Sequence, residues 1–159
     1  MDNKKYISQA IALAQDCLLD AKRYPFGSIV VKDDKVVGVG MEATRVKHDP
    51  TAHSEILAIR DACKKLGTSN LKDCIMYSSS EPCSMCLSAI MWAKIETVYF
   101  ACSREDVYHF GFPDKFKLVK KRVDSQEIKM HHIKCEAGHK VFEDWRIKNN
   151  KKTCNDAQS

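Results

Sequence analysis

The chain has 159 residues, of which 44% are hydrophobic, and this length is enough to bury the core of one domain without disulfide bonds. The formal net charge is +5, from 26 lysines and arginines against 21 aspartates and glutamates, and the excess is concentrated at residues 115–129 and 148–152. A run of like charges usually forms a solvated face, and a surface for nucleic acid is the alternative.

The cysteines and the N-terminus argue against a secreted or membrane protein. The eight cysteines are scattered and do not form the pattern of a disulfide framework. Ser8, Gln9, Gln15 and Asp16 interrupt the first apolar stretch, so we expect neither a signal peptide nor a membrane span. Together these features indicate a protein of the reducing cytoplasm.

The beginning of the chain predicts a helix followed by a β-hairpin. Apolar residues recur at helical spacing over about residues 6–21, which predicts an amphipathic helix. Residues 28–31 and 36–40 are apolar runs typical of strands, and the polar residues 32–35 between them predict a hairpin loop. An antiparallel pair therefore opens the sheet.

The middle of the chain alternates helices with strands. Pro50, preceded by a capping aspartate, predicts the start of one helix, and a second helix is expected from Pro82 to about Trp92. Residues 74–78 and 97–101 predict two further strands. This alternation implies parallel crossovers and an α/β sandwich around one mixed sheet.

The pattern weakens after residue 101. Residues 103–117 are too polar and too often interrupted for a core helix, whereas residues 127–135 are compatible with a fifth strand and residues 140–149 with a closing helix. We expect residues 1–150 to form a single domain and residues 151–159 to be a frayed tail.

Two short motifs in the middle of the chain have the spacing of metal ligands. Cys83 and Cys86 lie three positions apart behind a proline that suits the first turn of a helix, so their sulfurs project to one side of that turn. The partial positive charge of a helix N-terminus favours the thiolate, the form that binds Zn²⁺. His53 supplies a third ligand and Glu55 follows it, in the order typical of zinc-dependent nucleoside and nucleobase deaminases.

Each of these residues also has a simpler interpretation. A lone C-x-x-C occurs in thioredoxin-like redox pairs and in zinc ribbons. A ribbon needs a second C-x-x-C, which the other cysteines do not form, and a redox pair gives no reason for His53 and Glu55. A single histidine is usually a core residue and a single glutamate a surface residue, but the two motifs in this order favour a metal site.

The ligand number indicates catalysis rather than a structural role. Three protein ligands leave one tetrahedral position for a water molecule. Binding to the metal lowers the pKa of that water. The Glu55 carboxylate can take the proton of that water, pass it to a ring nitrogen and later protonate a leaving amine. The expected reaction is hydrolytic loss of ammonia from an amino-substituted ring.

The motifs at residues 25–27, 49–55, 81–86 and 111–114 resemble those of the cytidine-deaminase-like superfamily, and within it the short bacterial-type guanine deaminases. The resemblance implies a three-layer α/β/α sandwich with a central five-stranded mixed sheet and one catalytic Zn²⁺ per subunit. It also implies the conversion of guanine to xanthine with release of ammonia. The implied assembly is a domain-swapped homodimer, in which the C-terminal segment closes the active site of the partner.

The resemblance implies that four residues contact the substrate, namely Phe26, Glu42, Ala52 and Asp114. Glu42 stands where this family usually has an asparagine that touches the base. Because an ionised glutamate only accepts hydrogen bonds, we expect Glu42 to select a base that presents N–H groups, as guanine does, with Asp114 as a second acceptor. The tail at residues 151–159 also lacks the terminal aromatic residue that often caps the pocket in this family.

Three other functions remain open at this stage. One is deamination of a pterin, a triazine or another purine, because Glu42 alters the pocket. Another is deamination of the wobble adenosine of tRNA, which uses the same zinc motif, although two carboxylates near the mouth would repel a phosphate backbone. The third is a non-catalytic zinc-binding or RNA-binding module, against which Glu55 argues, because a structural zinc has no use for a proton shuttle.

Overall fold

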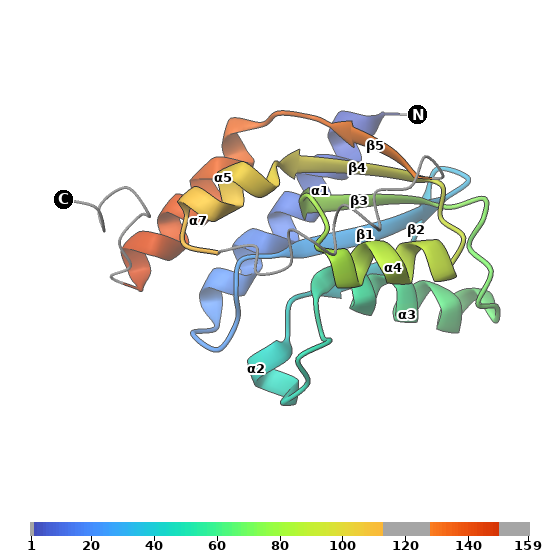
Figure 1. Cartoon of the computed structure of the whole chain (residues 1–159), viewed down its shortest axis with the longest axis horizontal. Coiled ribbons are helices and arrows are strands. Elements are labelled where there is room, and N and C mark those ends of the chain that lie inside the picture. Colours follow the sequence, from blue (N-terminus) through green and yellow to red (C-terminus); the bar gives the residue numbers. More distant parts are fainter. Residues whose placement is uncertain (1, 113–127, 150–159) are drawn as a thin grey trace.

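The computed structural model describes residues 2–112 and 128–149 (Figure 1). Helices and strands alternate along most of this length. In chain order they are α1 (Asn3–Asp16), the short 3-10 helix η1 (Cys17–Leu19), β1 (Gly27–Lys32), β2 (Lys35–Met41), α2 (Thr44–Lys47), α3 (Ser54–Leu66), β3 (Ile75–Ser80), α4 (Ser84–Trp92), β4 (Thr97–Cys102), α5 (Arg104–His109), β5 (Lys129–His132) and α7 (Glu136–Lys148).

The five strands form one mixed sheet in the order β2-β1-β3-β4-β5. β1 runs antiparallel to both β2 and β3, whereas β3, β4 and β5 are parallel to one another. The hairpin between β1 and β2 turns at Asp33 and Asp34, whose φ angles of 48° and 56° suit the tight turns that match the twist of paired strands. The predicted five-stranded mixed sheet is confirmed.

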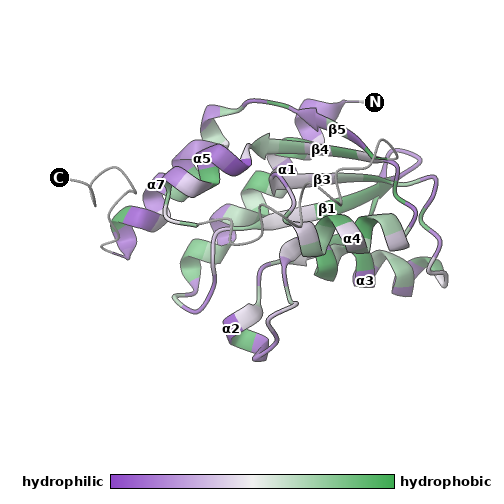
Figure 2. Ribbon diagram, viewed as in Figure 1, coloured by the Kyte–Doolittle hydropathy of each residue, from purple (hydrophilic) through white to green (hydrophobic). Residues whose placement is uncertain are grey.

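Helices cover both faces of the sheet, so the molecule has three layers (Figure 1). Ile29 and Val31 pack with α1 and α7 on one face, while Val30 between them packs with α3 and α4 on the other. In Figure 2 hydrophobic residues gather on β1, β3 and β4 and on α3 and α4, whereas β5 and α5 are largely hydrophilic. The predicted α/β/α sandwich is therefore confirmed.

Two glycines in β2 allow α3 to lie directly on the sheet. A Cβ atom at Gly40 would lie 1.9 Å from the carbonyl oxygen of Ser54, and one at Gly38 would lie 2.3 Å from that of Ala58. No side chain fits in either place, so any other residue there would push the helix away. These contacts fix the first turn of α3 against the sheet.

Both helices that carry the predicted metal ligands begin later than the prolines suggest. α3 begins at Ser54 rather than at Pro50, because the side chain of Asp49 accepts hydrogen bonds from the N–H and hydroxyl groups of Thr51 and closes a turn instead. α4 likewise begins at Ser84 rather than at Pro82. As a result, the N-cap residues of α3 and α4 are themselves predicted ligands.

Residues 103–117 were predicted to be too polar and too often interrupted for a core helix, and the structure has a short helix, α5, in their first part. α5 occupies Arg104–His109 because Ser103 and Asp106 form a capping box, in which each side chain accepts the backbone N–H of the other. Val107 is its one buried residue within the described part of the chain. α7 also begins at Glu136, earlier than predicted. Among the described residues, every helix is too short or too polar to cross a bilayer.

Candidate metal centre

The structure brings the three predicted metal ligands together. The Nδ1 atom of His53 lies 3.7 Å from the Sγ atom of Cys83 and 3.6 Å from that of Cys86. All three ligand atoms lie within 4.8 Å of one another. Two sulfurs and an imidazole nitrogen at such separations form a donor set that suits tetrahedral Zn²⁺.

The fold places these ligands at the starts of two neighbouring helices. His53 is the N-cap residue of α3 and Cys83 is that of α4, and Cys86 is buried in the first turn of α4. The two helices lie side by side and begin at the same end of the sheet (Figure 1). Their N-terminal dipoles both favour negative charge, so they stabilise thiolates at this point.

The three ligand side chains shift one another's pKa values. The hydrogen bond with Cys86 lowers the pKa of Cys83 to about 4, although burial opposes this shift, and His53 adds to it. The same bond and burial raise the pKa of Cys86 well above its usual value. The hydrogen bond with Cys83 raises the pKa of His53. Because metal ligands bind in their deprotonated forms, zinc must displace the protons of this cluster.

Glu55 lies beside the ligands in the first turn of α3. It is 5% exposed, and burial is the main cause of its raised pKa. The negative charge of Cys83 raises that pKa further, while His53 and a hydrogen bond from Ser54 lower it. A buried carboxyl group next to a zinc site is suited to moving protons between water and a bound substrate.

Glu42 is 2% exposed at the end of β2, and its carboxylate already accepts three hydrogen bonds. Oε2 accepts the N–H of Tyr24 at 2.8 Å, and Oε1 accepts both the N–H of Thr44, at 2.8 Å, and its hydroxyl group. Since a carboxylate offers about four acceptor positions, about one remains. Through these bonds Glu42 links the loop before β1 to the loop after β2. The negative charge of Glu42 also helps to raise the pKa of His53.

Backbone hydrogen bonds connect three of the predicted substrate contacts. The N–H of Glu42 donates to the carbonyl oxygen of Phe26 at 3.0 Å, and the N–H of Ala43 donates to that of Ala52 at 3.0 Å. Ala52 is fully buried immediately before His53. Phe26, Glu42 and Ala52 are therefore parts of one wall beside the metal ligands. Asp114 and the tail at residues 151–159 lie outside the described residues.

An aromatic cluster beside Phe26 was not recognised from the sequence as part of the site. The Phe26 ring lies 5.1 Å from that of Phe112 and 5.3 Å from that of Phe142, and Trp145 lies 4.8 Å from Phe112. These rings come from three distant segments, so no spacing in the sequence could have joined them. They fix α7 against the wall that contains Phe26.

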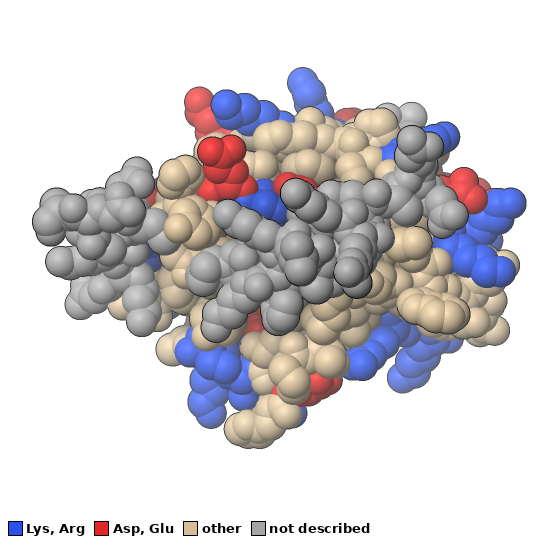
Figure 3. All heavy atoms as spheres, viewed as in Figure 1, with Lys and Arg blue, Asp and Glu red and all other residues tan. Residues whose placement is uncertain are grey.

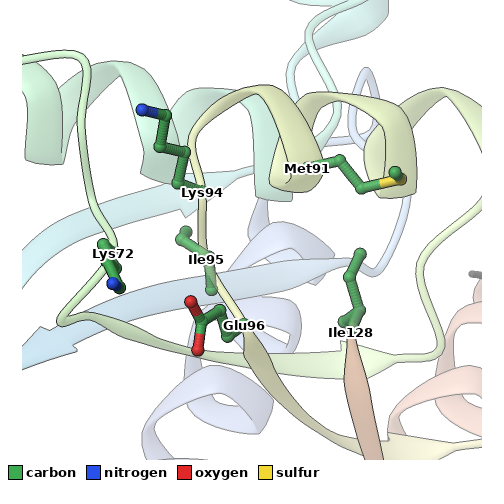
Figure 4. Close-up of a pocket in the computed structure, with 6 residues that line it drawn as sticks. All are labelled: Lys72, Met91, Lys94, Ile95, Glu96 and Ile128. Atoms are coloured by element: carbon green, nitrogen blue, oxygen red, sulfur yellow. The ribbon is translucent and has the colours of Figure 1, made fainter. Parts of the chain in front are cut away.

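A hollow in the described structure lies away from the metal ligands. Its volume is about 500 Å³, and it is lined by Lys72, Met91, Lys94, Ile95, Glu96 and Ile128 (Figure 4). Met91 lies near the C-terminal end of α4, whereas Cys83 caps its N-terminal end, about 12 Å away at the usual rise of an α-helix. None of the predicted site residues lines this hollow, so it is not the candidate active site.

The described charges are mixed on the face of the molecule that Figure 3 shows. In Figure 3 the lysines and arginines of the visible face lie around its edge and are interspersed with acidic residues. Of the basic residues that concentrate at 115–129 and 148–152, only Lys129 and Lys148 lie within the described part of the chain. The described part of this face thus has the mixed charge of a solvated surface.

Comparison with known proteins identifies a matching family and sequence relatives. The family model described as "Cytidine and deoxycytidylate deaminase zinc-binding region" matches residues 1–102. A guanine deaminase from Bacillus subtilis is 37% identical over 154 residues, which cover 96% of this chain and 99% of the relative. A tRNA-specific adenosine deaminase from Aquifex aeolicus is 31% identical over 128 residues, which cover 79% of this chain and 83% of the relative.

Solved structures show the same fold. The crystal structure of the Bacillus subtilis guanine deaminase matches with a TM-score of 0.72 at 36% identity, covering 96% of this chain and 98% of that one. A guanine deaminase from Nitrosomonas europaea matches with a TM-score of 0.79 at 22% identity, covering 89% and 83% of the two chains. The second match supports the fold alone.

Proposed function

The chain belongs to the cytidine and deoxycytidylate deaminase family, and on this premise we propose that it hydrolyses guanine to xanthine and ammonia. One observation carries the proposal: the buried Glu55 lies beside a cluster of His53, Cys83 and Cys86, in a chain that matches a guanine deaminase over nearly its full length. Zinc bound by this cluster would supply a Lewis acid that activates water for attack on the ring carbon that carries the amino group.

We assign the proton transfers to Glu55. Its carboxylate accepts a proton from the attacking water and delivers it to the neighbouring ring nitrogen. A second transfer through the same carboxyl group protonates the leaving amine. A C–O bond forms and the C–N bond breaks, so one water is consumed and one ammonia is released. Burial of Glu55 keeps bulk water away from these transfers.

We assign substrate contacts to the wall that contains Phe26, Glu42 and Ala52, and to Asp114. The backbone hydrogen bonds that connect the wall support this assignment, because they hold its members in fixed positions beside His53. The remaining acceptor position of Glu42 fits an N–H group of the base. The contacts of Asp114 stay a prediction.

The second candidate function is deamination of adenosine in tRNA. It is favoured by the similarity to the tRNA-specific adenosine deaminase of Aquifex aeolicus, although that similarity covers 79% of this chain and the similarity to the guanine deaminase covers 96%. The buried carboxylate of Glu42 argues against a polyanionic substrate at the same wall. Guanine is therefore the better-supported substrate.

A panel assay of ammonia release tests this proposal. The panel contains guanine, other purines, a pterin, an amino-triazine, cytosine, adenosine and tRNA, each given to the zinc-loaded protein and to Glu55→Gln. We expect release from guanine that depends on Glu55. Efficient release from tRNA with none from any free base would establish the second candidate instead.

We further propose that the chain acts as a homodimer in the cytoplasm. Trp92 at the end of α4 is 87% exposed, and a second copy that covers this ring would remove it from water. The seven cysteines within the described residues are all free, as expected in a reducing compartment. Exchange of the C-terminal segment between subunits stays a prediction. Analytical ultracentrifugation, which we expect to give the mass of two chains, tests the assembly.

A further inference from the structure

Three buried serines form a chain of hydroxyl groups that ends on Glu55. The Oγ atoms of Ser78 and Ser28 are 3.0 Å apart, and those of Ser28 and Ser54 are 2.8 Å apart. Ser54 in turn donates its hydroxyl proton to the Oε2 atom of Glu55 at 3.0 Å. Each serine is at most 1% exposed, so water does not compete for these bonds.

The sheet and α3 bring the serines together. Ser28 in β1 and Ser78 in β3 are directly opposite each other in the antiparallel register. On its other side Ser28 is paired with Gly40 of β2. The carbonyl oxygen of Ser54 packs against Gly40, where a Cβ atom would have no room. Without a side chain at Gly40, the first turn of α3 comes close enough for Ser54 to reach Ser28.

The hydrogen bond from Ser54 to Glu55 fixes the donor in each of the other hydrogen bonds between the three serines. A hydroxyl group has one proton to donate, and Ser54 gives its proton to Glu55. The bond between Ser54 and Ser28 must then be donated by Ser28, and the next bond must be donated by Ser78. All three protons therefore point toward the carboxylate, and each bond polarises the next in the same sense.

We propose that Ser54, supported by Ser28 and Ser78, is a positioning residue for the Glu55 carboxyl group. This inference rests on the proposed function of Glu55 as the proton carrier. The torsion that turns a glutamate carboxyl group has broad, weak preferences, so the group needs an external contact to hold one orientation. Ser54 holds Oε2 and so limits the rotation of the carboxyl group that carries the protons.

Substitution of Ser54 by alanine tests the proposal. We expect Ser54→Ala to keep its zinc and its KM, while kcat falls about tenfold, the effect of one lost hydrogen bond to a charged group. Ser54→Thr keeps the hydroxyl group and should retain more of kcat than Ser54→Ala does. Ser78 is the serine farthest from Glu55 in this series of hydrogen bonds, so Ser78→Ala should lower kcat by a smaller factor.

The matched control is Ser79→Ala. Ser79 is also a buried serine of β3, but its hydroxyl oxygen accepts the N–H of Gly27 at 3.1 Å. This variant should lower Tm, because a buried N–H loses its partner, while kcat stays within about twofold of the wild-type value. Loss of stability alone would therefore not reproduce the effect of Ser54→Ala.

A second readout does not depend on activity. If the Ser54 hydroxyl group is hydrogen-bonded to the Glu55 carboxyl group, the shifts in Tm caused by Ser54→Ala and Glu55→Gln should not add in the double variant. Additive shifts, or a Ser54→Ala protein with the kcat of the wild type, would overturn the inference while leaving the proposed function intact. If the wild-type protein releases no ammonia from any substrate in the panel, the proposed function fails. The comparison of Tm shifts in the single and double variants then decides alone whether Ser54 holds Glu55.

Discussion

The Nδ1 atom of His53 lies 3.6 Å from the Sγ atom of Cys86, although 33 positions separate the two residues in the chain. The sheet produces this contact, because α3 and α4 both pack on one face of it and begin at the same end. Each helix contributes an N-cap residue, so the ligands sit where two helix dipoles converge. The chemistry of the site follows from this convergence.

Zinc content tests the ligand set. We expect close to one zinc per chain in the purified protein, because two thiolates and an imidazole bind this metal tightly. Cys83→Ala should lose most of it, as measured by elemental analysis. Cys63→Ala is the matched control, since this cysteine is free and lies near the C-terminal end of α3. A Cys83→Ala protein with full zinc and full activity would rule out the site.

Replacement of Glu55 tests its role as the proton carrier. Glu55→Gln should keep zinc and fold while kcat falls by about a hundredfold or more, the usual contribution of a general acid or base. Glu96→Gln, which neutralises an exposed carboxylate in the distant hollow, should leave kcat unchanged. The assignment would be wrong if Glu55→Gln lost zinc or unfolded early while its turnover per folded molecule stayed normal.

Glu42 has two expected roles that one substitution separates. Glu42→Asn should shift the order of preference among substrates rather than abolish deamination, because asparagine offers a donor as well as an acceptor. It should also lower stability by about 1–3 kcal/mol, because the shorter side chain leaves the N–H groups of Tyr24 and Thr44 short of an acceptor. Glu42→Gln keeps the length and serves as the comparison. Unchanged preference across the panel would remove Glu42 from the substrate contacts.

The capping box of α5 should make stability depend on acid pH. Burial alone would raise the pKa of Asp106, but hydrogen bonds from Ser103 and the contact with His139 outweigh it and lower that pKa below 3.8. The carboxylate therefore stabilises the fold fully above the unfolded pKa, and this contribution is lost as pH falls through the folded pKa. Asp106→Asn should lower Tm at neutral pH, and the deficit should shrink as pH drops below about 4. A deficit that stays constant with pH would contradict this role.

The metal ligands could be predicted from the sequence because their spacing is itself a chemical constraint. Cys83 and Cys86 must share one turn, and His53 with Glu55 marks the second half of the motif. The starts of the two helices were predicted less well, since Pro50 and Pro82 fit turns as readily as first helical turns. A proline in the sequence does not show which backbone N–H groups near it will be hydrogen-bonded in a turn and which in a helix.

Contacts between distant segments were beyond what the sequence could predict. The three hydrogen bonds that Glu42 accepts arise from the path of two loops, and Ser28, Ser54 and Ser78 meet only because the strand register and Gly40 allow it. Buried serines look like ordinary surface residues in a sequence. α5 was missed because its stability comes from a capping box rather than from an apolar stripe.

The formation of xanthine from guanine by the zinc-loaded wild-type protein tests whether this site deaminates guanine. Ammonia and xanthine should appear in equal amounts, at a rate that Glu55→Gln lowers by about a hundredfold or more and that tRNA added in place of guanine does not reproduce. If the zinc-loaded protein produces no xanthine, or produces it equally well with Glu55→Gln, the account of this site is contradicted.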